Sequence, residues 1–188
     1  MDQIYKHPKR KTKVVFVQLG SPSEPTTKAL RKYLRKFLGD PRVVDINPWL
    51  WKIILNFFVL PFRPKKSAKL YARIWDGKSF PLITNTRDFT NNVREELKKI
   101  DPNGHVEVNH AFLLSPPYVN EVYDSWEDDL KKGIGATKLL VIPMFPQYSE
   151  STIASGIDAL AKELSKRVKI PTFEVITNFH RTHAFIDN

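Results

Sequence analysis

Apolar residues occur along the chain in two patterns, and the two patterns predict strands and helices in turn. Continuous apolar runs rich in β-branched residues predict buried strands, whereas apolar residues three and four positions apart predict amphipathic helices. We expect strands at Val14–Leu19, Val106–Leu114, Lys138–Phe145 and Thr172–Asn178. We expect helices at Thr26–Leu38, Ser67–Trp75, Thr86–Ile100, Tyr118–Lys132 and Thr152–Arg167, and the start of another at His180–Asn188. This alternation predicts an α/β fold with a four-stranded parallel sheet.

The segment Ile46–Phe62 is the most apolar part of the chain. It is about as long as the shortest membrane-spanning helix, but Lys52 interrupts it and prolines lie near both ends. We therefore expect a buried or half-exposed amphipathic helix. Its apolar side chains fall on two faces, Trp49, Ile53 and Phe57 on one, and Trp51, Ile54 and Phe58 on the other. An ordinary core would bury the Trp49 face, whereas apolar residues on two sides favour an exposed lip or an interface.

A polar turn within Val141–Leu160 joins a buried strand to the next helix. Junctions of this kind lie at the edge of an open α/β sheet where ligands bind. The free N–H groups and the dipole of the helix add a preference for anions. Ser149, Ser151 and Thr152 stand where the helix is expected to begin. They predict either an anion site or simple N-capping residues, and the sequence leaves both open.

The composition is that of an ordinary globular protein with a surplus of positive charge. The 188 residues, 41% of them hydrophobic and 27% charged, can build one substantial domain. The chain has no cysteine, which excludes disulfides, zinc–thiolate sites and a cysteine nucleophile. Part of the formal net charge of +10 lies in Lys6–Lys13. We therefore assign residues 1–12 to a basic N-terminal arm and residues 13–188 to the domain.

The positive charge favours acidic partners, but it does not by itself select one class. Nucleic acid is not expected, because the basic residues are not interleaved with aromatic residues in any RNA-binding or DNA-binding motif. No secretory signal is recognisable, so a cytoplasmic location is expected. No two of the five histidines have the spacing of a metal site. His110, which lies within a predicted strand, is expected to be a structural residue rather than a ligand.

Four stretches of the chain carry a resemblance to a known family. They are KTKVVFVQLGSPSEPTTKALRKYLRKFLGDPRVVDI (Lys11–Ile46), LPFRPKKSAKLYARIWDGKSFPLI (Leu60–Ile83), PMFPQYSESTIASGIDAL (Pro143–Leu160) and NFHRTHAFI (Asn178–Ile186). They contain an LGSP turn after the first strand, a basic turn followed by an SA-x-x-Y-x-x-IW helix, and a PQYSEST segment. In this order they resemble the ferrochelatases, the enzymes that insert ferrous iron into a porphyrin.

The resemblance implies a three-layer αβα domain, a chelatase-like, Rossmann-type half. Ferrochelatases have two such halves with the porphyrin in the cleft between them, and the chain resembles the N-terminal one. The family's proposed metal-handling His and Glu lie in the other half, so no catalytic residue is assigned and activity as a lyase stays open. The family also usually ends its second strand in Met-Arg-Tyr. Phe112, Leu113 and Leu114 occupy those places here, so Leu113 replaces the cationic Arg.

The same resemblance implies a site for protoporphyrin IX or heme at the ends of the strands. Gly20 and Ser21 would border the cleft, and Trp51, Ile54 and Phe58 would belong to an apolar lip. Arg63, Lys65 and Lys66 would orient the propionates, unless they are only a solvated turn. The polar junction would contribute Gln147, Tyr148, Ser149, Ser151, Thr152 and Ser155. No metal ligand and no nucleotide are expected, although ferrous iron could enter as a substrate.

Three functions agree with these features. The first is a ferrochelatase-like protein of heme biosynthesis or heme handling that inserts iron only when a second half is supplied. A homodimer mate or a separate C-terminal ferrochelatase half would supply it, and a two-fold dimer could hold one heme between equivalent faces. The second is a fragment, or one subunit, of a working ferrochelatase. The third is a non-catalytic heme-binding or interaction module that kept the fold. In each case the apolar lip predicts a peripheral contact with a membrane.

Overall fold

The sheet is visible in a computed structural model of the chain, which describes residues 11–133 and 136–187. Four parallel strands lie in the order β2-β1-β3-β4. Their bounds are Thr12–Gln18 for β1, Val106–Phe112 for β2, Lys138–Pro143 for β3 and Thr172–Val175 for β4. Val14 in β1 lies opposite Val108 in β2 and Leu140 in β3. The predicted four-stranded parallel sheet is confirmed.

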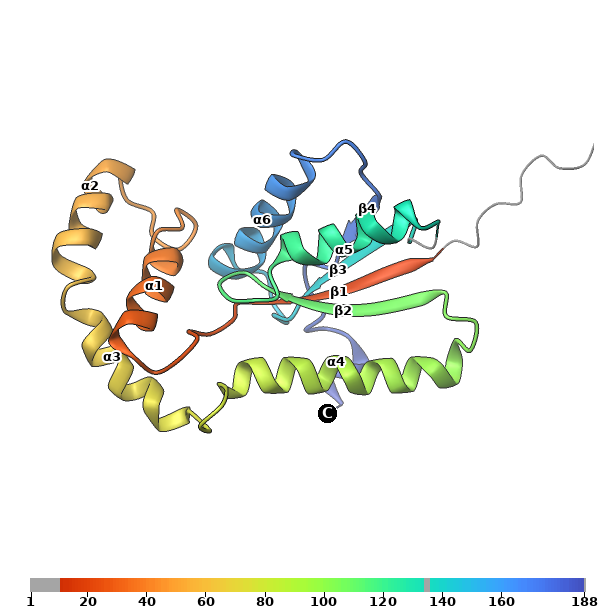
Figure 1. Cartoon of the computed structure of the whole chain (residues 1–188), viewed down its shortest axis with the longest axis horizontal. Helices are drawn as coiled ribbons and strands as arrows, with labels where there is room; N and C mark the ends of the chain where they lie inside the picture. The colour runs from red at the N-terminus through yellow and green to blue at the C-terminus, as the bar shows by residue number, and fades with distance from the viewer. Residues whose placement is uncertain (1–10, 134–135, 188) are drawn as a thin grey trace, which may run out of the picture.

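Helices cover both faces of the sheet (Figure 1). The helix α4 (Pro81–Ile100) lies along one face, and α5 (Val119–Lys131) and α6 (Ser155–Leu164) lie along the other. Alternate residues of β1 point to opposite faces, so Val15 and Val17 pack in the cluster that contains Trp126 and Leu160. The side chains of Val14 and Phe16 belong instead to the cluster beside α4. The three-layer αβα architecture is therefore confirmed.

A group of helices lies beyond the carboxyl ends of the strands (Figure 1). It consists of α1 (Thr27–Leu38), α2 (Pro48–Ile54), a π-helical turn at Leu55–Val59, α3 (Arg63–Tyr71) and a 3₁₀ turn at Ala72–Ile74. The Thr26 hydroxyl begins α1 by accepting a hydrogen bond from the Ala29 N–H at 3.2 Å. The group has its own core, which includes Leu34, Leu55 and Leu60. It forms a lobe that faces the edge of the sheet.

Several predicted boundaries were wrong. The helix α3 begins at Arg63 rather than Ser67, because Pro64 fits the first turn of a helix and is buried there. The helix α4 likewise begins at Pro81 rather than Thr86. The strands β3 and β4 end at Pro143 and Val175, before the predicted Phe145 and Asn178.

The described C-terminal segment adds little to this architecture. A short helix, α7 (His183–Ile186), lies where the start of a further helix was predicted. Residues 1–10 of the predicted basic arm lie outside the described residues, and Thr12 already belongs to β1. Within residues 11–133 and 136–187, no helix is both long enough and apolar enough to cross a bilayer.

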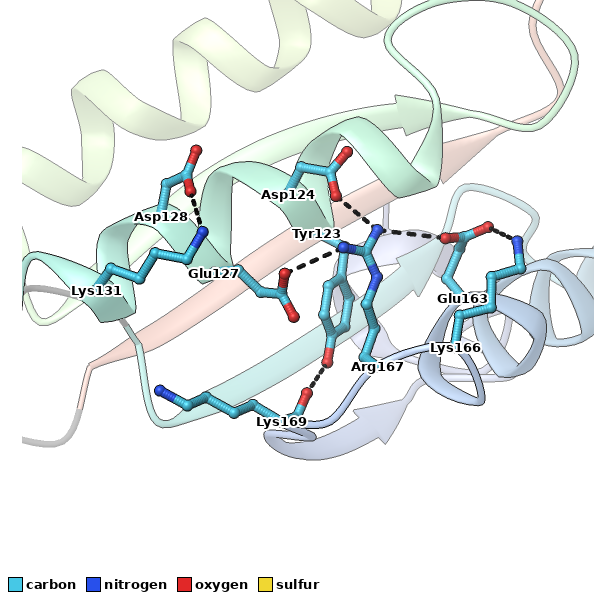
Figure 2. A network of polar contacts seen from close by, with 9 residues as sticks. All are labelled: Tyr123, Asp124, Glu127, Asp128, Lys131, Glu163, Lys166, Arg167 and Lys169. Atoms are coloured by element: carbon cyan, nitrogen blue, oxygen red, sulfur yellow. Dashed lines mark hydrogen bonds and ion pairs between the residues drawn. The ribbon is translucent and has the colours of Figure 1, made fainter.

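Arg167 ties α5 to the end of α6 (Figure 2). Its guanidinium lies 2.6 Å from Asp124 and 3.1 Å from Glu127, both on α5, and 3.5 Å from Glu163 on α6. The same group lies over the ring of Tyr123 at 5.0 Å. These contacts fix one helical layer as a unit, as expected for a planar cation with several donors.

Arg94 of α4 covers the outer side of β2. Its Nε donates a hydrogen bond to the carbonyl of Val108 at 2.7 Å, and its Nη2 donates to Oδ1 of Asn109 at 3.1 Å. Since β2 stands at one end of the sheet order, the Val108 carbonyl has no neighbouring strand on that side. A side chain thus takes the place of a backbone partner.

Candidate functional site

The carboxyl ends of β1, β2 and β3 meet the helical lobe at one edge of the sheet (Figure 1). A cavity of about 160 Å³ at this edge is lined by residues from three distant parts of the sequence. Leu19 follows β1, Leu113 follows β2, and Ser151 and Ser155 follow β3. This edge is where open α/β sheets bind ligands. The structure therefore brings two of the predicted hydroxyl residues together with Leu113.

The turn after β1 is held by unusual backbone geometry at Gly20. Its φ is +92°, a conformation that other residues rarely adopt. A Cβ at this position would collide with the Ser115 hydroxyl. The Ser21 N–H donates a hydrogen bond to that hydroxyl at 3.3 Å, and Ser21 itself is buried. Gly20 and Ser21 thus lock the β1 turn onto the turn after β2, which gives both residues a structural role at the edge of the site.

Tyr33 on α1 connects the helical lobe to the same turn. Its hydroxyl donates a hydrogen bond to the Gly20 carbonyl at 3.5 Å. Burial, with a smaller contribution from the neighbouring Tyr71, raises the pKa of the Tyr33 hydroxyl. Tyr33 therefore stays neutral and able to donate throughout the physiological pH range.

The junction after β3 does not begin as an ordinary capped helix. A π-helical turn at Glu150–Ala154 precedes α6, and no side chain caps either element. The Ser149 and Ser151 hydroxyls instead lie 3.1 Å from each other. The Thr152 hydroxyl is buried and has no hydrogen-bond partner among the described residues. The simple N-capping interpretation of these hydroxyls is therefore wrong.

The remaining residues of the junction differ in exposure. Gln147 and Tyr148 are exposed, whereas Ser155 is buried and donates a hydrogen bond to the Glu150 carbonyl at 3.4 Å. The part of the turn nearest the strand is thus open to solvent. Whether any of these side chains contacts a ligand stays a prediction.

An ion pair spans the site between the helical lobe and α6. The guanidinium of Arg42, just beyond α1, contacts both oxygens of Asp158 at 2.7 and 3.1 Å. Asp158 also lines the 160 Å³ cavity. The hydrogen bond from Arg42 lowers the pKa of the Asp158 carboxyl. The pair thus joins the segment after α1 to α6 beside this cavity, with a two-point contact that fixes direction as well as distance.

We expect Asp158→Arg and Arg42→Asp each to speed backbone hydrogen exchange across residues 43–60, because either change puts like charges together between the lobe and α6. The double reversal should restore the slow exchange. The depressed pKa of Asp158 means that the wild-type contact is present above the ordinary carboxyl range and is lost as the pH falls through the lowered pKa. Hydrogen–deuterium exchange at neutral and acid pH measures both effects. Failure of the double reversal to restore protection would contradict this role.

The apolar segment around α2 exposes the face that an ordinary core would bury. Trp51 packs in the core of the lobe and its indole N–H donates to the Leu38 carbonyl at 2.6 Å. Trp49 and Phe57, on the face expected to be buried, are 78% and 70% exposed. A π-helical turn follows this helix. Its Leu60 N–H donates to the Leu55 carbonyl at 2.8 Å, and both leucines pack in the core of the lobe with residues of α1.

The exposed face of α2 and the following turn carries a band of large apolar side chains. They are Trp49, Leu50, Ile53, Phe57, Phe58 and Phe62, which we call the lip. Of the predicted lip residues, Phe58 belongs to this band, Ile54 is half-buried and Trp51 faces inward. The predicted contact of this band with a partner or a membrane stays a prediction.

The basic cluster forms the first turn of α3 rather than a loop. Arg63, Lys65 and Lys66 are exposed, and none of them has a hydrogen bond or ion pair within the part of the chain that the structure describes. They are free to meet an anion, but no wall encloses them. Their proposed role toward propionates stays a prediction.

Three lysines that the sequence did not single out surround a second cavity. Lys32 and Lys36 lie on α1 and Lys78 lies before α4, and they line a space of about 310 Å³ with Tyr33 and Phe80. Lysines on the polar side of an amphipathic helix are normally solvated, so only the four-residue spacing of Lys32 and Lys36 could have drawn attention to that pair. Lys78 lies outside the helix.

The histidines form no metal centre among the described residues. No group of three His, Asp or Glu side chains there is arranged to hold a metal ion. His110 packs against Phe112 with ring centroids 5.5 Å apart, and its Nδ1 is buried without a hydrogen bond. Burial, and then the charges of Arg94 and Arg87, lower the pKa of His110. The structural role of His110 stays a prediction.

Comparison with known proteins agrees with this geometry. The ferrochelatase family model matches residues 11–188. The ferrochelatase of Idiomarina loihiensis is 41% identical over 174 residues, which are 93% of the chain and 46% of that relative. The coproporphyrin III ferrochelatase of Streptococcus mutans is 37% identical over 178 residues, which are 94% of the chain and 53% of that relative. The chain thus spans about half the length of these curated relatives, and it belongs to the ferrochelatase family.

Proposed function

We propose that the chain binds protoporphyrin IX or heme at the carboxyl edge of its sheet, as a protein of heme biosynthesis or heme handling. It inserts ferrous iron only when a second half is supplied. One observation carries the proposal. Residues of the first and third stretches that resemble the ferrochelatases, Leu19 and Ser151 with Ser155, line one cavity beside Leu113 at the ligand-binding edge of the fold.

The chemistry of the edge suits a flat apolar ligand with acidic substituents. The lip offers apolar surface from Phe58 and its neighbours, and half-buried Ile54 adjoins it. Gln147, Tyr148, Ser149, Ser151, Thr152 and Ser155 supply hydrogen-bonding groups near the end of β3, while Gly20 and Ser21 shape the end of β1. Arg63, Lys65 and Lys66 orient carboxylates, and exposed cations of this kind contribute under about 1 kcal/mol each.

The need for a second half follows from what metal insertion requires. A porphyrin must lose two pyrrole protons to a base, and the iron needs ligands that it can exchange. The described residues hold no cluster that could bind iron. We propose that a separate C-terminal ferrochelatase half provides these groups, or that a homodimer mate does so by bringing side chains of two copies to one site. Either partner also covers the lip. Any part of the lip that the partner leaves uncovered contacts a membrane surface peripherally, which co-sedimentation with lipid vesicles tests.

A non-catalytic heme-binding or interaction module is the second candidate. Leu113 favours it, because an apolar side chain stands where the family usually has an Arg, and it packs against the core beside α5. A cation at this place would be available to a substrate carboxylate, and a leucine is not. In this candidate the fold and the ligand remain and the reaction is lost.

We expect the chain to bind protoporphyrin IX and heme saturably, with one ligand per chain or per dimer. Phe58→Ser should weaken binding several-fold, because it removes a large apolar side chain from the lip. Ile100→Ser is the matched control, since Ile100 is 78% exposed at the far end of α4. Soret titration gives the affinity, and size-exclusion chromatography before and after loading gives the stoichiometry.

The outcomes separate the two candidates. Binding together with iron insertion on addition of a C-terminal ferrochelatase half supports the enzymatic role. Binding without insertion under any pairing supports the non-catalytic module. A strictly monomeric chain that is indifferent to both porphyrin and heme contradicts the proposal.

A further inference from the structure

His110 lies on β2, on the face of the sheet that α4 covers. It stands opposite Phe16 of β1, and its ring contacts the ring of Phe112 with centroids 5.5 Å apart. Val108, two residues earlier on the same face of the strand, packs in the cluster that contains Leu97 of α4. The imidazole thus belongs to the layer between the sheet and α4.

One nitrogen of this imidazole is enclosed by the packing. The Nδ1 atom of His110 is buried and has no hydrogen-bond partner among the described residues. A neutral imidazole carries a proton on one nitrogen only, so it can leave Nδ1 as a bare acceptor. A protonated imidazole carries a proton on both nitrogens, and Nδ1–H would then be a buried donor without an acceptor, which is costly. The packing therefore accepts the neutral ring and opposes the charged one.

Two positive charges of α4 act on the same ring. Burial, and then the charges of Arg94 and Arg87, lower the pKa of His110. Arg94 is fixed in its place, because its Nε donates to the Val108 carbonyl at 2.7 Å and its Nη1 donates to Oδ1 of Asn91 at 2.9 Å. A charge gained by His110 would thus lie beside a cation that is held by its own hydrogen bonds.

A cavity of about 180 Å³ lies beside the ring, where α5 adjoins β2. His110 and Arg94 line it together with Glu121 and Ser125 of α5, and Glu121 is the one acidic residue of this lining. The elements around the ring therefore present two cations from α4, one carboxylate from α5 and the apolar Phe16 from β1. The cavity gives a proton access to the ring, and it gives a charged ring a space near a carboxylate and away from the buried packing.

We propose that His110 is a pH-sensitive element, which holds α4 against β2 while its ring is neutral and loosens that contact when the ring gains a proton. The charged ring turns toward the 180 Å³ cavity, and Arg94 gives up its contact with the Val108 carbonyl. Because β2 leads directly to Leu113, which lines the 160 Å³ cavity, this opening extends to the edge of the candidate site. The behaviour belongs to the chain itself and does not depend on the proposed function.

The contact between α4 and β2 should be complete at neutral pH and should weaken on acidification. Once α4 has opened, His110 has the ordinary histidine pKa of about 6.5. Above that pH the ring is neutral in both states. Below it only the open state takes up the proton, so the opening equilibrium should rise by up to about tenfold per pH unit. The rise should end below the lowered pKa of the packed state, where both states are protonated.

Hydrogen–deuterium exchange of the full chain from about pH 7.5 to about pH 5 measures this opening, with each rate divided by the intrinsic rate at that pH. Protection over residues 81–100 and 106–112 should fall on acidification. His110→Asn, which keeps a polar side chain that takes up no proton in this range, should remove the pH dependence. His183→Gln should retain it, because the His183 side chain is fully exposed on α7. An unchanged pH dependence in His110→Asn overturns the proposal.

A second measurement leaves His110 in place. Titration of the imidazole signals in ¹H–¹³C NMR spectra should give His110 a pKa below the ordinary value. Arg87→Gln removes an exposed charge that acts on the ring, so it should raise this pKa and reduce the acid-induced opening. Lys99→Gln, at the exposed end of α4, should change neither. An ordinary pKa of His110 overturns the proposal, as does a raised pKa in Arg87→Gln without a smaller opening.

Discussion

Gly20→Ala should lower the free energy of unfolding by about 2–4 kcal/mol. Part of this loss is the cost of a φ of +92° for a residue with a Cβ. The rest comes from overlap with the Ser115 hydroxyl and close approach to Cβ of Phe112 at 3.0 Å. Ser115 cannot move freely, because its hydroxyl accepts the Ser21 N–H. Denaturant unfolding followed by circular dichroism measures the change.

Gly77→Ala is the matched control for this prediction. Its φ is +95°, and a Cβ there would meet nothing within 4 Å. We expect a loss of only about 1–2 kcal/mol, the backbone cost alone. Equal losses at the two glycines would show that contact with Ser115 is unimportant. A Gly20→Ala protein as stable as wild type would contradict the described geometry of the turn.

The paired change Glu107→Gln with Asp129→Asn should cost about 2 kcal/mol, because it leaves the charge of Lys13 without a partner. Lys13 lies on β1 and is 0% exposed. Its Nζ lies 3.3 Å from Glu107 and 3.6 Å from Asp129, and it has no hydrogen bond among the described residues. The Glu107 side chain is half exposed, so water already stabilises part of its charge in the wild type. This limits the loss of stability that the paired change causes.

Removing the lysine should have the opposite consequence. Lys13→Met replaces the buried charge with an apolar side chain of similar length, and we expect it to be neutral or to stabilise the fold by about 1 kcal/mol. The exposed pairs on α4 supply the control, since Glu95→Gln with Glu96→Gln should cost less than about 1 kcal/mol. Thermal and urea unfolding measure all three. A large loss in Lys13→Met would mean that the buried ion pair itself stabilises the protein.

The sequence predicted the sheet well, because strands buried on both faces are continuous apolar runs. Val14, Val15, Phe16 and Val17 are all buried, and no other element type explains such a run after a basic leader. The start of α3 was missed for a local reason. Pro64 between basic residues is typical of a turn, and only its burial against the lobe shows that it belongs to a first helical turn.

The candidate site was predictable only in part. The hydroxyls after β3 and the turn at Gly20 could be identified, since both follow directly from their positions at strand ends. The outward face of the lip could not be identified, because the segment is apolar on two faces and its contacts with α1 decide which face is buried. The 310 Å³ cavity lined by Lys32, Lys36 and Lys78 depends on how α1, the turn after β2 and the segment before α4 come together, which no local pattern of residues encodes.

Arg94 has a consequence for how two copies of this chain can associate. A second copy that extended the sheet beyond β2 would need to donate a hydrogen bond to the Val108 carbonyl. This carbonyl already accepts one from the Arg94 guanidinium. Capping an outer strand with a charged side chain is a common defence against edge-to-edge aggregation. A continuous eight-stranded sheet across this edge is therefore disfavoured. The dimer proposed above should instead form through the lip, and Arg94→Ala should expose a route to fibrous or sheet-extended assemblies.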